Sequence, residues 1–131
     1  MNIGMAAKRS GVPAKTIRYY ESIGLIPPAQ RTESGYREYG RNEIDTLRFV
    51  QRARGLGFSV KDVGRLLDLW RDRSRASGDV KALATEHIEE IDRKITELRS
   101  MRDTLQRLSE QCHGDERPDC PILEGLAGDG R

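Results

Sequence analysis

The only two cysteines of the chain, Cys112 and Cys120, lie on either side of a short polar loop, HGDERPD. In a reducing compartment, a close cysteine pair is more often a metal or redox site than a structural disulfide. Two thiolates without a third suit a soft monovalent ion, so the pair favours Cu(I), Ag(I) or Au(I). Zn(II) normally takes four ligands, and the loop adds only His113 and carboxylates. A reversible disulfide, or two cysteines with no joint role, stay open as alternatives.

The neighbours of the pair indicate which elements hold it. Cys112 ends a long segment of helical pattern, and Cys120 directly precedes the proline of PILEGLAG. Proline at the first position is typical of a helix start, so Cys120 is the expected N-cap residue of a short terminal helix. Its sulfur would lie at the positive end of that helix, where a thiolate is favoured. The sequence therefore predicts a soft-metal site between two helix ends.

A second group of side chains near the N-terminus is suited to phosphate and base contacts. Residues 1–60 hold ten Lys and Arg against five Asp and Glu, whereas residues 61–131 hold thirteen against sixteen. A basic half favours a polyanion such as nucleic acid, although a merely solvated surface would give the same counts. The stronger indication is that five such side chains crowd one predicted helix: Lys15, Thr16, Arg18, Tyr19 and Tyr20.

Two short helices joined by a tight turn are expected to position that group. Asn2 suits an N-cap, and Gly11 suits the left-handed residue that ends the first helix. Pro13 suits the start of a second helix, which runs on to Gly24 and has Ile17 on its buried face. The pattern predicts a helix-turn-helix. An ordinary amphipathic helical hairpin is the alternative, but it would not explain the crowded polar and aromatic face.

The segment RTESGYREY, residues 31–39, predicts a small β-hairpin wing. Its central Ser-Gly pair is a turn signal, and Tyr36 and Tyr39 favour the flanking strands. Arg31 and Arg37 would direct its charge at a phosphate backbone. A plain solvated hairpin is the alternative.

A second helical pair is predicted after the wing. Asn42 is the expected cap of the helix EIDTLRFVQRARGLG, and Ser59 with Asp62 forms a plausible capping box before VKDVGRLLDLW. The stretch GFSVKDV also echoes GVPAKTI of the first pair. We therefore expect a second unit that resembles a helix-turn-helix.

The segment from Asp79 to about Glu110 contains neither Pro nor Gly, which predicts one helix ~48 Å long. His87 is expected to be a packed or exposed helix residue rather than a ligand. Apolar residues recur every three or four positions on this helix, and the rest of its surface is charged. This narrow apolar stripe requires one partner helix, so the spacing predicts a coiled-coil homodimer. This apolar stripe consists of Ile88, Ile91, Ile95, Leu98, Met101, Leu105 and Leu108.

Composition argues against several classes of protein. No segment approaches the roughly 18 apolar residues of a membrane helix, and the N-terminus lacks the pattern of a secretory signal, so we expect a soluble cytoplasmic protein. There is no Gly-rich phosphate cradle and no nucleophile-base constellation, so we expect no enzyme. A copper buffer or chaperone could use the cysteine loop, but it has no need of a basic helix-turn-helix.

In this order, NIGMAAKRSGVPAKTIRYYESIGLI, RTESGYREY and the long helix resemble the MerR family of transcription regulators over essentially the whole chain. The end of the long helix and CHGDERPDCPILEGLAG are similar to the copper-responsive, CueR-like branch. The resemblance implies a mostly α fold. Its expected parts are a winged helix-turn-helix DNA-binding domain with a second helical pair over 1–70, a linker over 71–78, an antiparallel coiled-coil dimerisation helix over 79–111, and a metal-binding loop with a short terminal helix over 112–131.

The resemblance also implies roles for single residues. Cys112 and Cys120 would bind one Cu(I) per subunit, and Ser77 occupies the place where relatives that sense divalent metals carry a metal-binding cysteine. Redox-sensing relatives need four cysteines, which this chain lacks. The residues implied at the DNA are Lys15 at the groove and Arg18, Tyr20, Tyr36, Arg37 and Arg54 at the backbone.

The implied mechanism is allosteric activation of transcription. Metal binding would shift the dimer, which then bends and underwinds a promoter until RNA polymerase can engage it. The expected targets are genes for copper efflux or detoxification. A MerR-type sensor of another effector, such as a divalent metal or thiol oxidation, is the alternative.

Overall fold

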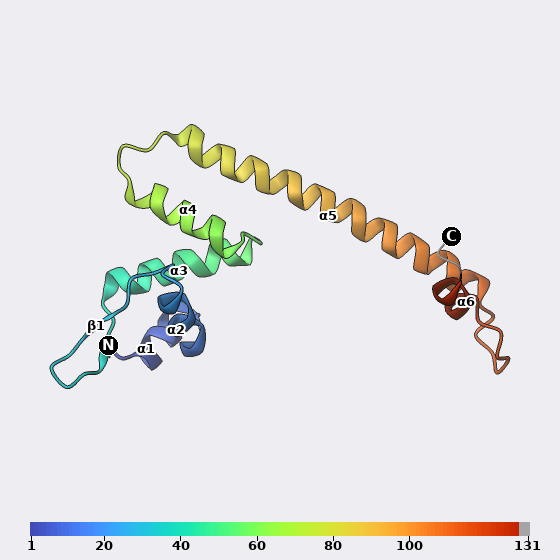
Figure 1. Ribbon diagram of the computed structural model, residues 1–131, viewed down its shortest axis with the longest axis horizontal. Helices are drawn as coiled ribbons and strands as arrows, with labels where there is room; N and C mark the ends of the chain where they lie inside the picture. The colour runs from blue at the N-terminus through green and yellow to red at the C-terminus, as the bar shows by residue number, and fades with distance from the viewer. Residues whose placement is uncertain (129–131) are drawn as a thin grey trace. The chain divides into compact units, whose positions relative to one another are not determined.

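The computed structural model describes residues 1–128, which divide between an N-terminal unit, Met1–Leu83, and a C-terminal unit that begins at Ala84. The chain is mostly helical, as expected, with one small antiparallel hairpin (Figure 1). The elements are α1 (Ile3–Ser10), α2 (Ala14–Ser22), β1 (Gln30–Arg31), β2 (Arg37–Glu38), α3 (Arg41–Gly55), α4 (Val60–Arg71), α5 (Ser77–Gln111) and α6 (Pro121–Ala127).

Local capping sets the ends of α1 and α2, as the sequence predicts. The side chain of Asn2 accepts a hydrogen bond of 2.9 Å from the amide of Met5. Gly11 has a φ of 79° and donates its amide to the carbonyl of Ala7, which closes α1 in a left-handed cap. Pro13 is the N-cap of α2, and Gly24 has a φ of 76° just beyond the end of that helix. The helix-turn-helix expected at the N-terminus is therefore confirmed in its geometry.

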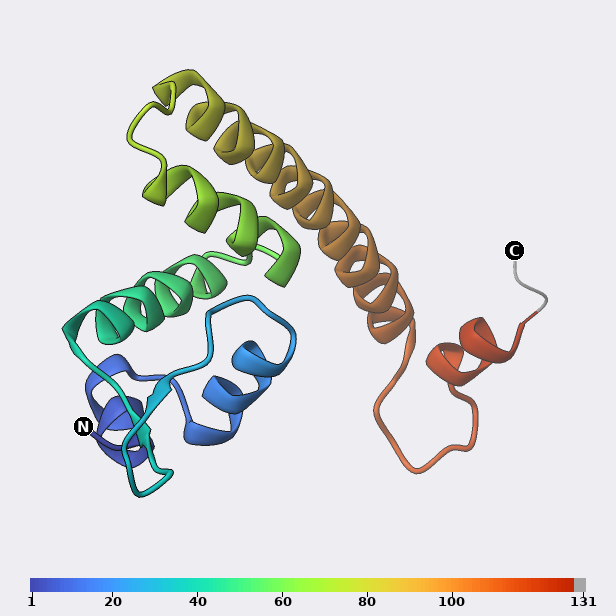
Figure 2. The same cartoon turned by 60° about the vertical axis from the view of Figure 1, so that its left-hand side comes forward.

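One hydrophobic core holds the N-terminal unit together, and α3 lies against α1 on one side and α4 on the other. Figure 2 shows α1 and α2 beside each other below α3, with the hairpin extending from them. The expected core residue Ile17 is fully buried. The other core residues are Ala6, Val12, Tyr20, Ile26, Tyr39, Ile44, Leu47, Val50, Ala53, Phe58, Val63 and Leu67.

The hairpin is shorter than the sequence pattern suggests. Its strands pair Gln30 with Glu38 and Arg31 with Arg37, and neither predicted strand tyrosine lies in them. Tyr36 lies in the connecting loop, while Tyr39 follows β2 and enters the core. Tyr39 leaves the ladder because its amide donates to the carbonyl of Met1 at 2.7 Å.

The predicted cap of α3 was wrong by two residues. Gly40 is the N-cap, and the carboxylate of Glu43 accepts a hydrogen bond of 3.0 Å from its amide. Asn42 therefore lies inside the first turn, where its carbonyl accepts from the hydroxyl of Thr46. The cap of α4 is as expected, because the hydroxyl of Ser59 accepts from the amide of Asp62 at 3.1 Å.

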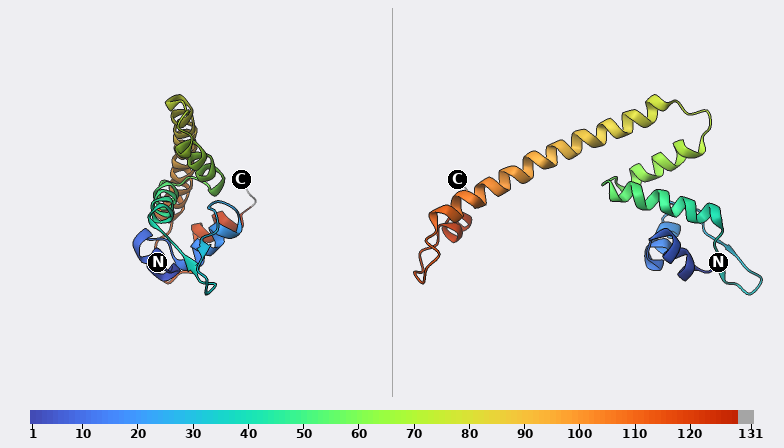
Figure 3. Two further views of the ribbon diagram at one scale, coloured as in Figure 1. Left: turned by 90° about the vertical axis from the view of Figure 1, so that its left-hand side faces the viewer. Right: turned by 180° about the vertical axis from the view of Figure 1, so that it is seen from behind.

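Helix α5 has 35 residues. The right-hand view of Figure 3 shows that it is unbroken. It begins at Ser77 rather than at 79, so the connection after α4 is shorter than the expected linker. Its apolar stripe is exposed from Ile88 to Leu105. Leu108 differs, because it is partly buried against α6. No helix in the described part of the chain is long and apolar enough to cross a membrane.

Candidate nucleic-acid interface and cysteine loop

A groove on the N-terminal unit brings α2 and the hairpin together. Arg18 of α2 and Arg31 and Arg37 of the hairpin line it, beside Tyr36 of the hairpin loop. Three guanidinium groups at one groove, with an aromatic ring next to them, can contact successive phosphates of a nucleic-acid backbone. The sequence placed these four residues in two separate elements, and the structure joins them into one surface.

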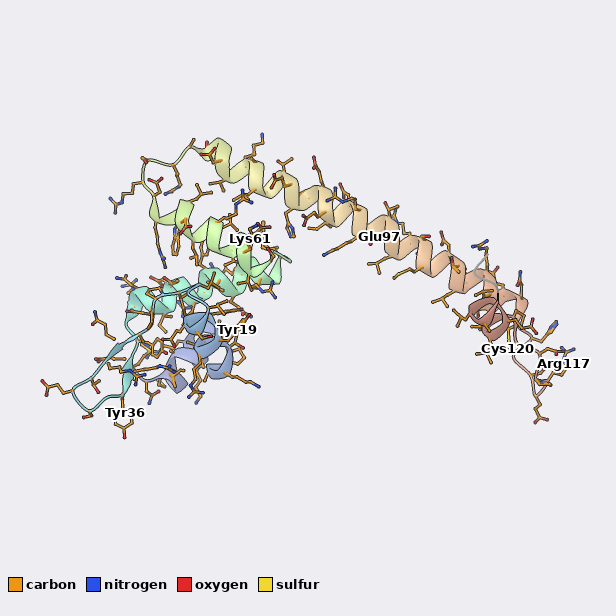
Figure 4. The ribbon with its side chains drawn as sticks, in the orientation of Figure 1. Tyr19, Tyr36, Lys61, Glu97, Arg117 and Cys120 are labelled. Atoms are coloured by element: carbon orange, nitrogen blue, oxygen red, sulfur yellow. The ribbon has the colours of Figure 1, made fainter. Side chains whose placement is uncertain are left out.

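The side chains expected on α2 do not all face solvent. Lys15, Arg18 and Tyr19 are exposed, and Thr16 is half-buried. Tyr20 is only 7% exposed and belongs to the core, with its ring 6.0 Å from that of Tyr19. The exposed face of α2 therefore offers Tyr19 rather than Tyr20 to a ligand. Figure 4 shows Tyr19 on α2 and Tyr36 on the hairpin.

Three of the predicted DNA-contacting arginines also make contacts within the protein. Arg31 donates to the carbonyl of Gly35 at 2.8 Å and so closes the hairpin loop. Arg54 donates to the carbonyl of Phe58 at 2.7 Å, across the turn between α3 and α4. Nε of Arg37 lies 3.8 Å from Oε1 of Glu21. These contacts hold the guanidinium groups in place before any ligand binds, which lowers the entropy lost on binding.

Glu21 and Tyr39 form a buried polar contact that the sequence analysis missed. The hydroxyl of Tyr39 donates to Oε1 of Glu21 at 2.9 Å, and the amide of Ala29 donates to Oε2 at 2.8 Å. Burial raises the pKa of Tyr39 to about 12, and the hydrogen bond and charge of Glu21 add to this effect. The charges of Arg37 and Arg18 act in the opposite direction. A signal existed, since Glu21 and Tyr20 follow Ile17 at helical spacing and so share its buried face.

The cysteine loop lies in the C-terminal unit, between the end of α5 and the start of α6 (Figure 2). Cys112 directly follows α5, and its amide donates to the carbonyl of Ser109 at 3.1 Å. Cys120 is the N-cap of α6 with proline at the first helical position, as the sequence predicts. Figure 4 shows Cys120 where the loop meets α6. Both cysteines are free thiols and half-buried.

The loop between them has its own internal contacts. Asp115 accepts from the amide of Arg117 at 2.9 Å and pairs with its guanidinium at 2.8 Å. Gly114 has a φ of 65°, a conformation that favours glycine. His113 is exposed. Within residues 1–128, no three His, Cys, Asp or Glu side chains gather closely enough to hold a metal ion. The two cysteines are therefore the soft donors that the ends of this loop offer.

After the loop, α6 packs against the end of α5 through Gly125 and Leu108. A Cβ on Gly125 would lie 2.6 Å from a terminal methyl of Leu108, so a larger residue there requires the Leu108 side chain to move. Leu108 thus contacts its own chain, although the sequence analysis assigned it to the dimer stripe. The position of Cys120 depends on this packing because it caps the same short helix.

Together these features define a class of protein. A helix-turn-helix with an adjacent basic hairpin, followed by a long helix with an exposed apolar stripe, is the architecture of a dimeric DNA-binding regulator. The comparisons agree. Residues 1–70 match the MerR HTH family regulatory protein model, and residues 44–108 match the model described as MerR, DNA binding. The chain belongs to the MerR family of transcriptional regulators and is not an enzyme.

Its relatives are similar over most of their length. Heavy metal-dependent transcription regulator 2 of Rhizobium meliloti strain 1021 is 65% identical over 127 residues, which cover 97% of this chain and 86% of that protein. The HTH-type transcriptional regulator CueR of Salmonella typhimurium is 44% identical, over 98% of this chain and 93% of the relative. The solved structure of the transcription regulator PbrR691 from Ralstonia metallidurans CH34, in complex with lead(II), matches with a TM-score of 0.82 and 32% identity. That match covers 96% of this chain and 98% of PbrR691.

Proposed function

We propose that this regulator is a dimeric transcriptional activator that responds to Cu(I), with Ag(I) and Au(I) as chemically equivalent effectors. Cys112 and Cys120 would hold the ion as thiolates, one ion per subunit. Bound metal would supply a fixed bridge between the end of α5 and the start of α6, two elements that are also joined by the loop and by the approach of Leu108 to Gly125. Target genes for copper efflux or detoxification follow from that specificity.

One observation carries the choice of ion. The two half-buried thiols lie at two helix ends, and the described residues contain no group of three or more His, Cys, Asp or Glu that could hold a metal ion. Divalent soft metals gain from a third or fourth ligand, whereas a monovalent ion is satisfied by two thiolates. The relatives support a metal effector, since one is named as heavy metal-dependent. The lead(II) complex of the more distant PbrR691 keeps a divalent sensor as the second candidate.

The DNA-binding half of the proposal rests on the groove between α2 and the hairpin. Arg18, Arg37 and Tyr36 would contact the backbone of promoter DNA, with Lys15 and Tyr19 at the groove edge and Arg54 at the turn after α3. Two copies joined along the stripe of α5 would place two such surfaces on one promoter. Metal binding would then change the bend and twist of the DNA that RNA polymerase meets, rather than the occupancy of the site.

The test is transcription in vitro from the protein's own promoter with purified RNA polymerase. Cu(I) is expected to raise transcript yield with the parent protein, and Cys112→Ser and Cys120→Ser are each expected to abolish the rise. DNA affinity should stay within about twofold of the parent, because the proposed DNA-binding residues and the two cysteines lie in different units of the chain.

His113→Ala is the matched control, since His113 lies in the same loop and is exposed. It should leave the response intact. A full copper response with either cysteine replaced would refute the proposed site. A response to Pb(II) but not to Cu(I) would favour the divalent candidate.

A further inference from the structure

We propose that Glu21 is a positioning residue of the DNA-binding surface: its buried carboxylate ties the hairpin to α2 and holds the Arg37 guanidinium at the groove. This inference concerns the N-terminal unit alone and does not depend on which metal the protein senses. Glu21 itself would not touch the DNA, because its side chain is only 4% exposed.

The contacts of Glu21 link three segments that are separate in the sequence. Its two oxygens accept from the amide of Ala29, before β1, and from the hydroxyl of Tyr39, after β2. Both bases of the hairpin are thereby fixed to one carboxylate on α2. A charged acceptor with two donors forms stronger hydrogen bonds than a neutral one, so this carboxylate is a rigid anchor for a hairpin whose own ladder is two residues long.

The same carboxylate acts on Arg37, which lines the groove with Arg18 and Arg31. Nε of Arg37 is 3.8 Å from Oε1 of Glu21, and the arginine side chain is 29% exposed. At that distance the charges attract without a close hydrogen bond. The guanidinium is therefore oriented by Glu21 and still able to bind a phosphate, which as a fully exposed anion forms shorter, bidentate contacts.

A negative charge beside DNA ordinarily weakens binding, so removing a carboxylate should increase DNA affinity. A positioning role for Glu21 predicts the opposite change, and the direction of the change in affinity therefore distinguishes the two explanations. Glu21→Gln and the control Glu38→Gln each remove one carboxylate from the hairpin region, and Glu38 is exposed in β2 next to Arg37. If charge alone matters, both variants bind DNA more tightly. The positioning role instead predicts that Glu38→Gln tightens binding about twofold, whereas Glu21→Gln weakens it about tenfold, the scale of one charge-assisted hydrogen bond.

The measurement is the dissociation constant of the full chain for a duplex that the parent protein selects from a random pool, over a series of salt concentrations. Glu21→Gln should lower the slope of log K against log salt by about 0.9, the share of one lost phosphate contact, while Glu38→Gln leaves it unchanged. Arg37→Ala should lose the same slope. The double variant with Arg37→Ala and Glu21→Gln should show no further loss of affinity or slope, because both substitutions remove the same phosphate contact.

Folding is checked by circular dichroism and thermal midpoint. If Glu21→Gln does not fold, Tyr39→Phe replaces it, since this variant removes a hydrogen bond to Glu21 and leaves every charge in place. It should also weaken binding, lower the slope and show no additivity with Arg37→Ala. Tighter binding by Glu21→Gln with an unchanged slope, or additive effects with Arg37→Ala, would overturn the proposal.

Discussion

Replacement of Ile95 and Leu98 by Asp tests whether the stripe of α5 is the dimer interface. The two side chains are 40% and 60% exposed in the single chain, so about half of each remains for a partner to cover. Full burial of such a side chain contributes roughly 2 kcal/mol, hence about 1 kcal/mol for each half-covered one. A dimer contains two copies of each, so the loss is ~4 kcal/mol, or roughly a thousandfold in the dimer dissociation constant. The cost of burying the new carboxylates adds to this figure.

Analytical ultracentrifugation over a range of protein concentrations measures that constant directly. The control is Thr96→Asp with Ser100→Asp, which adds the same charge to exposed positions on the opposite face of the helix. The control should remain dimeric, and the stripe variant should be monomeric and lose operator binding, since one DNA-binding unit holds only one half-site. A stripe variant whose dimer constant stays within about tenfold of the control would show that the interface lies on another surface.

Three further variants probe the separate parts of the account. Arg18→Ala should weaken DNA binding equally with and without metal and lower the salt slope by about 0.9; an unchanged slope would remove Arg18 from the phosphate contacts. Ser77→Cys should add a thiolate to the metal site, most simply from the partner subunit, and so admit a divalent ion such as Zn(II); a variant that ignores every divalent ion tested would place Ser77 away from the site. Gly125→Ala should displace the end of the Leu108 side chain at a cost of about 1 kcal/mol, the low end for overpacking, and weaken Cu(I) binding, measured by chelator competition. The control Gly55→Ala, in α3, places a Cβ that meets nothing within 4 Å and should bind copper like the parent. Equal copper affinity in both variants would show that the packing of α6 does not affect the metal site.

The sequence predicts well those features that depend on near neighbours. Asn2 and Gly11 mark the two ends of α1, because a cap interacts only with residues a few positions away. The absence of Pro and Gly over residues 79–110 predicts the long helix α5. Cys120 at the start of α6 follows from the proline after it. These features depend mainly on residues a few positions apart, so local pattern and side-chain chemistry are enough to predict them.

The features that sequence analysis missed depend on contacts between distant residues. Tyr39 leaves the hairpin because its amide donates to the carbonyl of Met1 and its hydroxyl donates to Glu21 in the core. Tyr20 was assigned to the DNA surface, yet it packs inside because it shares the face of Ile17. Gly40 rather than Asn42 caps α3 because the Glu43 side chain folds back to it. The DNA contacts and the metal site likewise depend on residues that are far apart in the sequence or on different subunits. Both therefore stay predictions.

X-ray absorption at the copper edge, on the reduced protein loaded with one Cu(I) per subunit, tests the central claim most directly. It counts and identifies the atoms bound to the ion, independently of DNA binding or transcription. The account predicts two sulfur neighbours and no nitrogen, with one sulfur lost in Cys112→Ser and in Cys120→Ser. A nitrogen neighbour in the parent protein would make His113 or another histidine a ligand, and a spectrum unchanged by both cysteine replacements would contradict the proposed site.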